Sequence, residues 1–346
     1  MRLENRLALV RATHLNSYIS VLRDIGAPVD RELDRSKLPS YIEETPDLYV
    51  SVPIAMDWVA RTGRDLDLME LGLLGAQAAS LSTLRPPQQA AVMAAQTGLT
   101  RLRALADVSR FEDSVLEMRV RREAGNVRVI CTMAGLDHHP LLCLAEWLNL
   151  QAIISVVRSV AGPSWQPSEM CFFSSNCPPA AVHAALPDTR ILVGQPQTSV
   201  VVESAYLALS TSRSTPCRAT TETSEDKQLG RSESWEFVKL LRKMLQPYLS
   251  EGRADIAFTA EMAGMSTRSL QRRLKLCGSS YSQILQEACF ELACIRLGDP
   301  GLKIIDVAMS VGYESPQHFT RAFRRFTGMT PTDYRGQTTA LDRSGL

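Results

Sequence analysis

Residues 297–335 read LGDPGLKIIDVAMSVGYESPQHFTRAFRRFTGMTPTDYR, and a weaker copy of their central pattern lies at residues 264–274, GMSTRSLQRRL. Aligning Ser266 with Ser315 superimposes a preceding glycine and a following amphipathic segment, and such internal repeats are informative about fold. In each copy a short helix is followed by the glycine, and the serine can cap the next helix through its hydroxyl. Helix, tight turn and capped helix are typical of a helix-turn-helix.

The second helix of each copy is expected to have an apolar face and a polar face. Leu270 and Leu274 lie one turn apart in the first copy, and Phe319, Phe323 and Phe326 are expected to face inward in the second. Arg and Gln can hydrogen-bond base edges, whereas Lys and further Arg hold phosphates. For one helix alone, the alternative is that its polar face is simply exposed to solvent. Because the same polar face occurs twice, we favour the interpretation that the two helices read DNA. The polar faces repeat the spacing i, i+3, i+4, i+7 with no acidic residue: Arg268, Gln271, Arg272 and Lys275, then Gln317, Thr320, Arg321 and Arg324.

Tyr281–Leu297 lies between the copies and has the length and apolar spacing of a single helix. Such a helix could hold two DNA-reading helices about 34 Å apart, the separation of successive major grooves. We therefore predict an all-α C-terminal domain with two helix-turn-helix units joined by a long helix.

The charge is distributed unevenly along the chain. The 346 residues carry a formal net charge of +1. Residues 1–230 have 22 basic and 25 acidic side chains, and residues 231–346 have 16 basic and 12 acidic. The nearly neutral total therefore does not exclude a nucleic-acid partner, because a mildly acidic front hides a basic C-terminal part.

Length and composition predict two domains. Residues 211–234, TSRSTPCRATTETSEDKQLGRSES, contain Ser, Thr and charged residues and almost no large apolar side chain, which is typical of a linker. The expected organisation is a sensing or assembly domain at 1–210, this linker, a DNA-binding domain at 235–335 and a tail at 336–346.

The front domain mixes helix and strand patterns, so we expect an α+β fold. Two short runs joined by Ala124–Asn126, residues 115–122 and 127–133, predict a β-hairpin. Further strands are expected at 169–173 and 198–202. Helices are expected at 7–25, 52–59, 66–79, 87–105, 141–160 and 178–186.

Several other classes of protein are disfavoured. No apolar run reaches the roughly 18 residues of a membrane helix, and the first ten residues do not resemble a signal peptide. Eight scattered cysteines without a C-x-x-C pair indicate a reduced, cytoplasmic chain without a structural metal. No phosphate-binding loop or hydrolase motif occurs, so we expect neither an enzyme nor a cofactor. His138 and His139 precede Pro140 and are expected in a surface turn rather than at a metal.

Taken together, residues 264–274 and 297–335 resemble the DNA-binding domain of AraC/XylS-type transcription regulators. That resemblance implies two helix-turn-helix units and a promoter as partner. Its base-reading positions fall on Arg268, Gln271, Arg272, Pro316, Gln317, Thr320 and Arg321, and phosphate contacts are expected from Thr267, Lys275, Ser315, Arg324 and Arg325.

Two residues depart from the family pattern. Pro316 has no amide hydrogen and no polar side chain, so it can only start the helix or touch a thymine methyl group. Cys289 occupies a position on the long helix where relatives usually carry arginine, which removes one expected ion pair or phosphate contact.

Residues 1–210 resemble the N-terminal domain of AraC-type regulators related to ornithine-utilisation and mycobacterial virulence regulators. The stretch RATHLNSYISVLRDIGAP at 11–28 and the Gly162-Pro163-x-Trp165-x-Pro167 turn carry this resemblance. It implies a transcription activator that senses a small-molecule effector, contacts RNA polymerase and can form a homodimer. Control by protein contact alone is the alternative. The candidate effector-binding residues are His14, Tyr18, Trp58 and Trp147. The alternative for His14 and Tyr18 is that they are polar residues on the surface. The alternative for the two tryptophans, and likewise for Trp165, is that they belong to the core.

Overall fold

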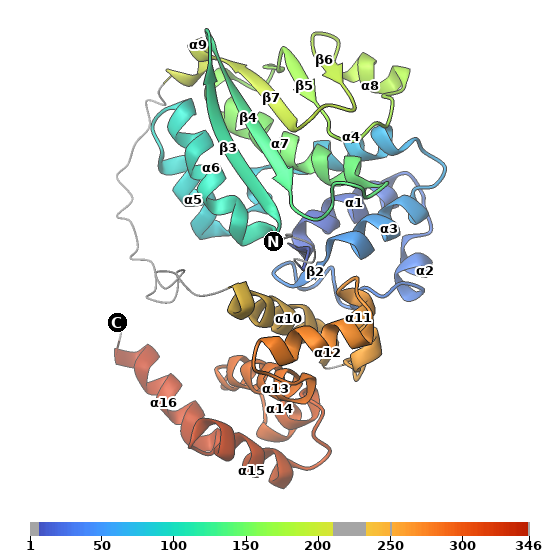
Figure 1. Ribbon diagram of the computed structural model, residues 1–346. Coiled ribbons are helices and arrows are strands. Elements are labelled where there is room, and N and C mark those ends of the chain that lie inside the picture. Colours follow the sequence, from blue (N-terminus) through green and yellow to red (C-terminus); the bar gives the residue numbers. More distant parts are fainter. Residues whose placement is uncertain (1–6, 210–232, 250, 345–346) are drawn as a thin grey trace. The chain divides into compact units, whose positions relative to one another are not determined.

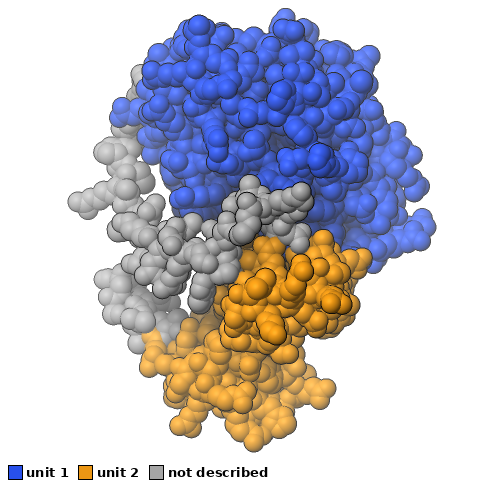
Figure 2. Space-filling model, viewed as in Figure 1, with its two compact units in different colours: residues 1–228 blue, residues 229–346 orange. Residues whose placement is uncertain are grey.

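The computed structural model describes residues 7–209, 233–249 and 251–344. The chain forms two compact units, residues 1–228 and 229–346 (Figure 2). The linker predicted at 211–234 lies outside the described residues except for its last two positions, where helix α10 begins. Each unit is described by itself below.

Unit 1 is an α+β domain around a five-stranded sheet (Figure 1). The strand order is β3-β4-β7-β5-β6, with antiparallel neighbours except for the parallel pair β5 and β6. The predicted hairpin is confirmed, because β3 and β4 pair in register from Leu116↔Met133 to Glu123↔Asn126. The strands are β3 (Leu116–Glu123), β4 (Asn126–Met133), β5 (Glu169–Cys171), β6 (Arg190–Leu192) and β7 (Thr198–Glu203).

Helix α7 (Leu142–Ala161) forms the centre of the unit 1 core. In the described part of the chain it is the one helix that length and composition would allow to cross a membrane, but half of its most apolar window is buried within the protein. Its buried side chains include Trp147, Leu150 and Ile153. These residues identify α7 as a core helix of unit 1.

Two glycines allow helix α4 (Leu68–Ala78) to lie close to its neighbours. A Cβ at Gly72 would lie 2.2 Å from Cδ1 of Trp147 on α7, and one at Gly75 would lie 2.1 Å from Cε1 of Tyr18 on α1 (Ala12–Asp24). Glycine weakens a helix, but here it is the residue that makes room for two buried aromatic rings. Tyr18 and Trp147 are thereby fixed in the core.

Two of the predicted helices differ from the observed ones. The helix expected at 7–25 begins only at Ala12, because Leu9–Arg11 form strand β1, which pairs with β2 (Tyr49–Ser51). The helix expected at 87–105 is two helices, α5 (Pro86–Ala94) and α6 (Gly98–Glu112). The helix is interrupted before Thr97, because Thr97 forms a capping box with Thr100 that starts a new helix.

The other elements of unit 1 surround this framework. The predictions at 52–59 and 178–186 correspond to α3 (Val52–Thr62) and α8 (Ala180–Ala185). Three short helices were not predicted: α2 (Val29–Asp34), the 3-10 helix η1 (Leu81–Thr83) and α9 (Ser204–Leu207).

Unit 2 is helical in its described residues. Helix α13 carries the buried Phe290, Ala293 and Leu297, which pack with Phe319 and Phe323 of α15 in one apolar cluster. The helices are α10 (Glu233–Leu249), α11 (Ile256–Met262), α12 (Thr267–Leu276), α13 (Tyr281–Leu297), α14 (Ile304–Ser310), α15 (Pro316–Thr327) and α16 (Pro331–Ser344).

Candidate nucleic-acid interface and N-terminal cavity

Helices α11 and α12 form a pair joined by a tight turn. Gly264 adopts a positive φ of +66°, a conformation that a side chain disfavours. The Ser266 hydroxyl accepts a hydrogen bond from the amide of Ser269 (3.2 Å), so the predicted N-cap is confirmed. Leu270 and Leu274 are buried, which leaves the opposite face of α12 to solvent.

The exposed face of α12 carries the predicted basic and amide side chains. Arg268, Gln271, Arg272 and Lys275 are all exposed, and α12 contains no acidic residue. Arg273 lies elsewhere on the helix, with its guanidinium 4.0 Å from the ring centre of Phe237. Thr267, at the first position of α12, is half-buried.

Helices α14 and α15 form a second pair, with Gly312 at φ +82° in the turn. Phe319 and Phe323 are fully buried, as expected. The expected N-cap is wrong in its chemistry: the Ser315 side chain makes no capping bond, because its hydroxyl donates to Oε1 of Gln317 (2.7 Å) instead. Pro316 starts the helix, which is a position that proline favours.

The polar face of α15 repeats that of α12. Gln317, Arg321, Arg324 and Arg325 are exposed, and Thr320 is half-buried. The Thr320 hydroxyl donates to the Pro316 carbonyl (2.8 Å), so it remains available as an acceptor.

The structure modifies one apolar prediction in unit 2, that for Phe326, and it shows the surroundings of Cys289. Phe326 is half-exposed rather than fully inward, although its ring stacks on Phe290 at a centroid distance of 4.5 Å. Cys289 packs against the apolar cluster of α13 and α15, and burial raises the pKa of its thiol to about 11. An ion pair elsewhere on α13 ties it to α10: Arg242 Nη1 lies 2.7 Å from Glu291 Oε1 and 3.2 Å from Glu287 Oε2.

Unit 1 contains a partly enclosed cavity between α1, α3, α6, α7 and β3. The centre of a water-sized sphere can occupy about 80 Å³ of it, more than a single buried water requires. Fourteen of its twenty lining residues are apolar, among them Val52, Met56, Leu105 and Leu148. A cavity of this character suits a small, largely apolar molecule.

The cavity includes one half of the predicted effector set. His14 and Tyr18 line it, and neither is a solvated surface residue, because Tyr18 is 3% exposed and the His14 side chain 17%. The Tyr18 hydroxyl donates to the Leu144 carbonyl (2.7 Å), and burial raises its pKa well above the ordinary value. Trp58 and Trp147 are fully buried and are not among the lining residues.

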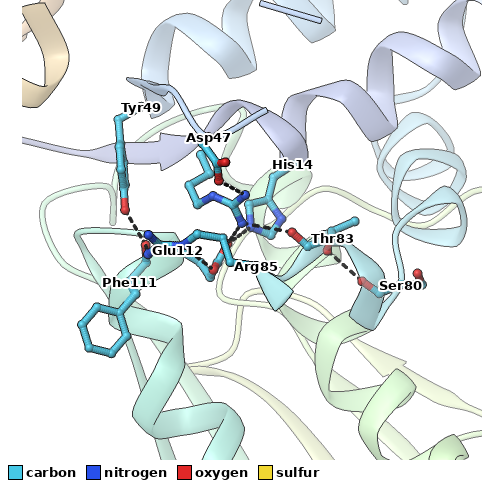
Figure 3. A network of polar contacts seen from close by, with 9 residues as sticks. His14, Asp47, Tyr49, Ser80, Thr83, Arg85, Phe111 and Glu112 are labelled. Atoms are coloured by element: carbon cyan, nitrogen blue, oxygen red, sulfur yellow. Dashed lines mark hydrogen bonds and ion pairs between the residues drawn. The ribbon is translucent and has the colours of Figure 1, made fainter. Parts of the chain in front are cut away.

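His14 and Glu112 of the cavity lining belong to a network of charged side chains (Figure 3). Arg11 donates to Glu112 Oε2 and to Asp47 Oδ1, each at 2.6 Å, and His14 Nε2 lies 3.2 Å from the same Glu112 oxygen. Burial opposes ionisation of Glu112, but the hydrogen bonds from His14 and Arg11 hold the pKa of its carboxyl below the ordinary value. Glu112 is therefore an ionised carboxylate in the wall of the cavity.

Asp113 is a second carboxyl group in this wall. Its Oδ1 accepts hydrogen bonds from the amides of Val115 (2.8 Å) and Leu116 (3.2 Å). Burial nevertheless raises the pKa of the Asp113 carboxyl to about 6.

The His138–His139 pair lies in a turn, as predicted. His138 is exposed, and Nδ1 of His139 accepts from the Leu141 amide (3.3 Å). Within the described ranges no group of three or more His, Cys, Asp or Glu side chains could hold a metal ion.

Comparison with known proteins now identifies the family. Residues 259–337 match the model of a helix-turn-helix domain, and this range runs from within α11 through α12, α13, α14 and α15 into α16. Residues 26–211, more than half of the chain, match the model of the N-terminal arabinose-binding domain of the AraC transcription regulator. The chain belongs to the AraC family of transcription regulators.

Individual AraC-family relatives resemble the chain over different lengths. The regulator VirS of Mycobacterium tuberculosis is 24% identical over 339 residues, 95% of this chain and 96% of VirS. The ornithine utilization regulator of Pseudomonas aeruginosa is 36% identical over 81 residues, which are 23% of this chain and 24% of that protein. The crystal structure of the transcriptional regulator CdpR from P. aeruginosa covers 93% of this chain and 96% of its own, with 20% identity and a TM-score of 0.40.

Sequence reasoning missed Arg11, Glu112 and Asp113. Arg11 and Glu112 are 101 positions apart, so no local pattern joins them. An acidic pair at the end of a helix is typical of a solvated surface, and nothing in the sequence marks this one as buried.

Proposed function

We propose that this AraC-family, DNA-binding regulator reads a promoter through two helix-turn-helix units, α11–α12 and α14–α15, held by α13 as a spacer. The observation that carries this proposal is the pair of matching exposed faces on α12 and α15. Each combines glutamine and arginine with no acidic residue, and each is fixed by two buried apolar residues on the opposite side of its helix.

The proposed base contacts are made by side chains on the polar face of each helix. Arg268, Gln271 and Arg272 would act in the first unit, and Gln317, Thr320 and Arg321 in the second. Arginine pairs with guanine and glutamine with adenine through two hydrogen bonds. The Ser315 hydroxyl holds the Gln317 carbonyl oxygen at 2.7 Å, so Gln317 must release this bond or read DNA through its amide nitrogen.

The proposed phosphate contacts flank the base-reading positions. Lys275, Arg324 and Arg325 are exposed cations at the C-terminal ends of α12 and α15. Thr267 and Ser315 lie at the N-terminal ends of these helices, where backbone amides also favour a phosphate. These contacts would set the register of the protein without selecting a sequence.

Selection of duplexes from a random pool by the full chain tests the proposal. Two short motifs about one helical turn apart should be enriched, because α12 and α15 would enter successive major grooves. Enrichment of no motif, or of one motif only, would contradict the two-unit reading.

We further propose that a small-molecule effector in the unit 1 cavity controls DNA binding. The family model matched by residues 26–211 is named for a sugar-binding domain, which supports a ligand here. The apolar lining is unsuited to a molecule with many hydroxyl groups, so arabinose itself is not the proposed ligand. His14 and Tyr18 are retained as lining residues, whereas Trp58 and Trp147 are not.

Thermal-shift screening of the full chain with amino acids, fatty acids and aromatic acids tests this control. A hit that also changes affinity for the selected duplex would support an effector. If a broad library gave no hit, control through protein contact alone would be favoured. We also propose that the chain acts in the cytoplasm, activates transcription through RNA polymerase and forms a homodimer. The proposed function includes no catalytic step.

A further inference from the structure

The polar end of the unit 1 cavity contains three hydrogen-bond acceptors besides His14. Ser109 and Glu112 lie one turn apart at the end of α6, and Asp113 follows directly. The Ser109 hydroxyl already donates to the Ala106 carbonyl (2.9 Å), so towards a ligand it can only accept. His14, the other polar residue at this end, faces Glu112 through Nε2.

One of these acceptors is buried and lacks a hydrogen bond. Glu112 is 4% exposed, and its Oε1 has no hydrogen-bond partner; the nearest cation, Nε of Arg85, is 3.9 Å away. The hydrogen bonds of Asp113 both go to Oδ1, which leaves Oδ2 without a partner among the described residues. Buried acceptors without donors are costly, and a ligand that donates would remove that cost.

The charges at this end favour a cationic head group over an anionic one. Glu112 is neutralised by Arg11, whose guanidinium lies 2.6 Å from Oε2 and is not part of the lining. In the described ranges no basic side chain forms an ion pair with Asp113, and His14 acts on it only through its charge. A ligand carboxylate would therefore meet two carboxyl groups in a low-dielectric site, whereas an ammonium group would complete an ion pair.

We propose that the cavity binds an amphipathic amine, with its ammonium group between Glu112 and Asp113 and its apolar body along α3 and α7. This inference rests on the proposed effector-sensing function and specifies the ligand class. The apolar body would contact Val59, Met56 and Leu148, and Asn149 would bound the far side of the lining.

Three probes with the same six-carbon chain separate the possible head groups: hexylamine, hexan-1-ol and hexanoate. Calorimetric titration of the full chain near neutral pH should show hexylamine binding most tightly, because it is protonated there like a lysine side chain. Asp113→Asn should weaken hexylamine binding about tenfold or more, the effect of losing a charged hydrogen-bonding partner. This variant keeps the acceptor for the Val115 and Leu116 amides, so the fold should be retained.

Asp188→Asn, in an exposed turn of unit 1, is the matched control and should bind hexylamine like the original chain. Ala152→Leu fills the cavity from α7 and should abolish binding of every probe. Equal or tighter binding of hexanol or hexanoate would overturn the amine assignment while leaving effector sensing intact. If no probe bound and Ala152→Leu left affinity for the selected duplex unchanged, both the amine assignment and the effector proposal would fail.

Discussion

The Asp113 carboxyl group is stabilised by two backbone amides and destabilised by its burial beside an apolar cavity. The effect of burial is larger than that of the hydrogen bonds, and it raises the pKa of this carboxyl group to about 6. Glu112, one position earlier, behaves in the opposite way because His14 and Arg11 donate to it. Adjacent carboxyl groups thus differ because His14 and Arg11 donate hydrogen bonds to Glu112, whereas His14 acts on Asp113 only through its charge and does not offset the burial.

Asp113→Asn should change how stability depends on pH. The folded pKa of about 6 exceeds the ordinary unfolded value of about 4, so the folded chain binds more protons between these values. The contribution of Asp113 is therefore fully present below about pH 4 and is lost as the pH rises through about 6, amounting to roughly 2–3 kcal/mol. Urea unfolding across this range should show the loss in the original chain and not in the variant. An identical pH profile for the two chains would contradict the buried, unpaired state of Asp113.

Lys275→Ala and Arg324→Ala should weaken binding to all duplexes alike. Each removes one exposed cation that we assign to a phosphate, so the slope of log affinity against log salt should fall by about one. Titration of the selected duplex and a scrambled duplex at several salt concentrations measures this effect. A loss confined to the selected duplex would instead place these side chains on bases.

Helix α4 packs closely against its neighbours because two of its residues are glycines without a side chain. Gly72 and Gly75 would be poor choices for an isolated helix, yet any Cβ there would collide with Trp147 or Tyr18. Gly72→Ala should therefore destabilise unit 1 by about 1–3 kcal/mol despite the better helix propensity of alanine. Denaturant unfolding followed by tryptophan fluorescence measures this. Gln77→Ala, at an exposed position of the same helix, should change stability little, and a neutral Gly72→Ala would refute the close approach.

Elements with strong local patterns were predicted well. The faces of α12 and α15 follow from periodicity, because each buried residue is one turn from the next. The hairpin β3–β4 follows from two alternating runs and a glycine turn. The break at Thr97 was missed because both helices continue the same apolar spacing across it, and only a side-chain capping box separates them.

The cavity could not be predicted because its parts come from distant segments. His14 was singled out by its spacing from Tyr18, but its partner Glu112 lies 98 positions away. Trp58 and Trp147 were reasonable pocket candidates by residue type, and the packing of α4 and Phe172 around Trp147 places that ring in the core. The polar and apolar faces of a helix follow from its local sequence, whereas a cavity forms only when distant segments pack together in the domain.

At the scale of the whole molecule, the chain combines a largely apolar cavity in one unit with paired polar helix faces in the other. The two faces are connected by α13, a continuous helix of 17 residues that is packed against α14 and α10. Because α13 is proposed to act as a rigid spacer, DNA recognition should be sensitive to the distance between the two half-motifs.

Insertion of about five base pairs, half a helical turn, between the half-motifs should therefore weaken binding about tenfold or more, because the second major groove would face away. Insertion of a full turn should not restore affinity, since α13 cannot lengthen. A fluorescence-anisotropy series of spacer lengths measures this. Equal affinity at every spacing would show that the two helix pairs do not bind together.

The most direct test of the central claim is the affinity of Arg272→Ala for the selected duplex and for its single-base variants, measured by fluorescence anisotropy. Arg190→Ala, an exposed arginine in unit 1, is the charge-matched control. The account predicts a loss of about 1–3 kcal/mol with relaxed preference at one base position for Arg272→Ala, and no change for the control. Unchanged affinity and unchanged base preference in Arg272→Ala would contradict direct reading of DNA by α12.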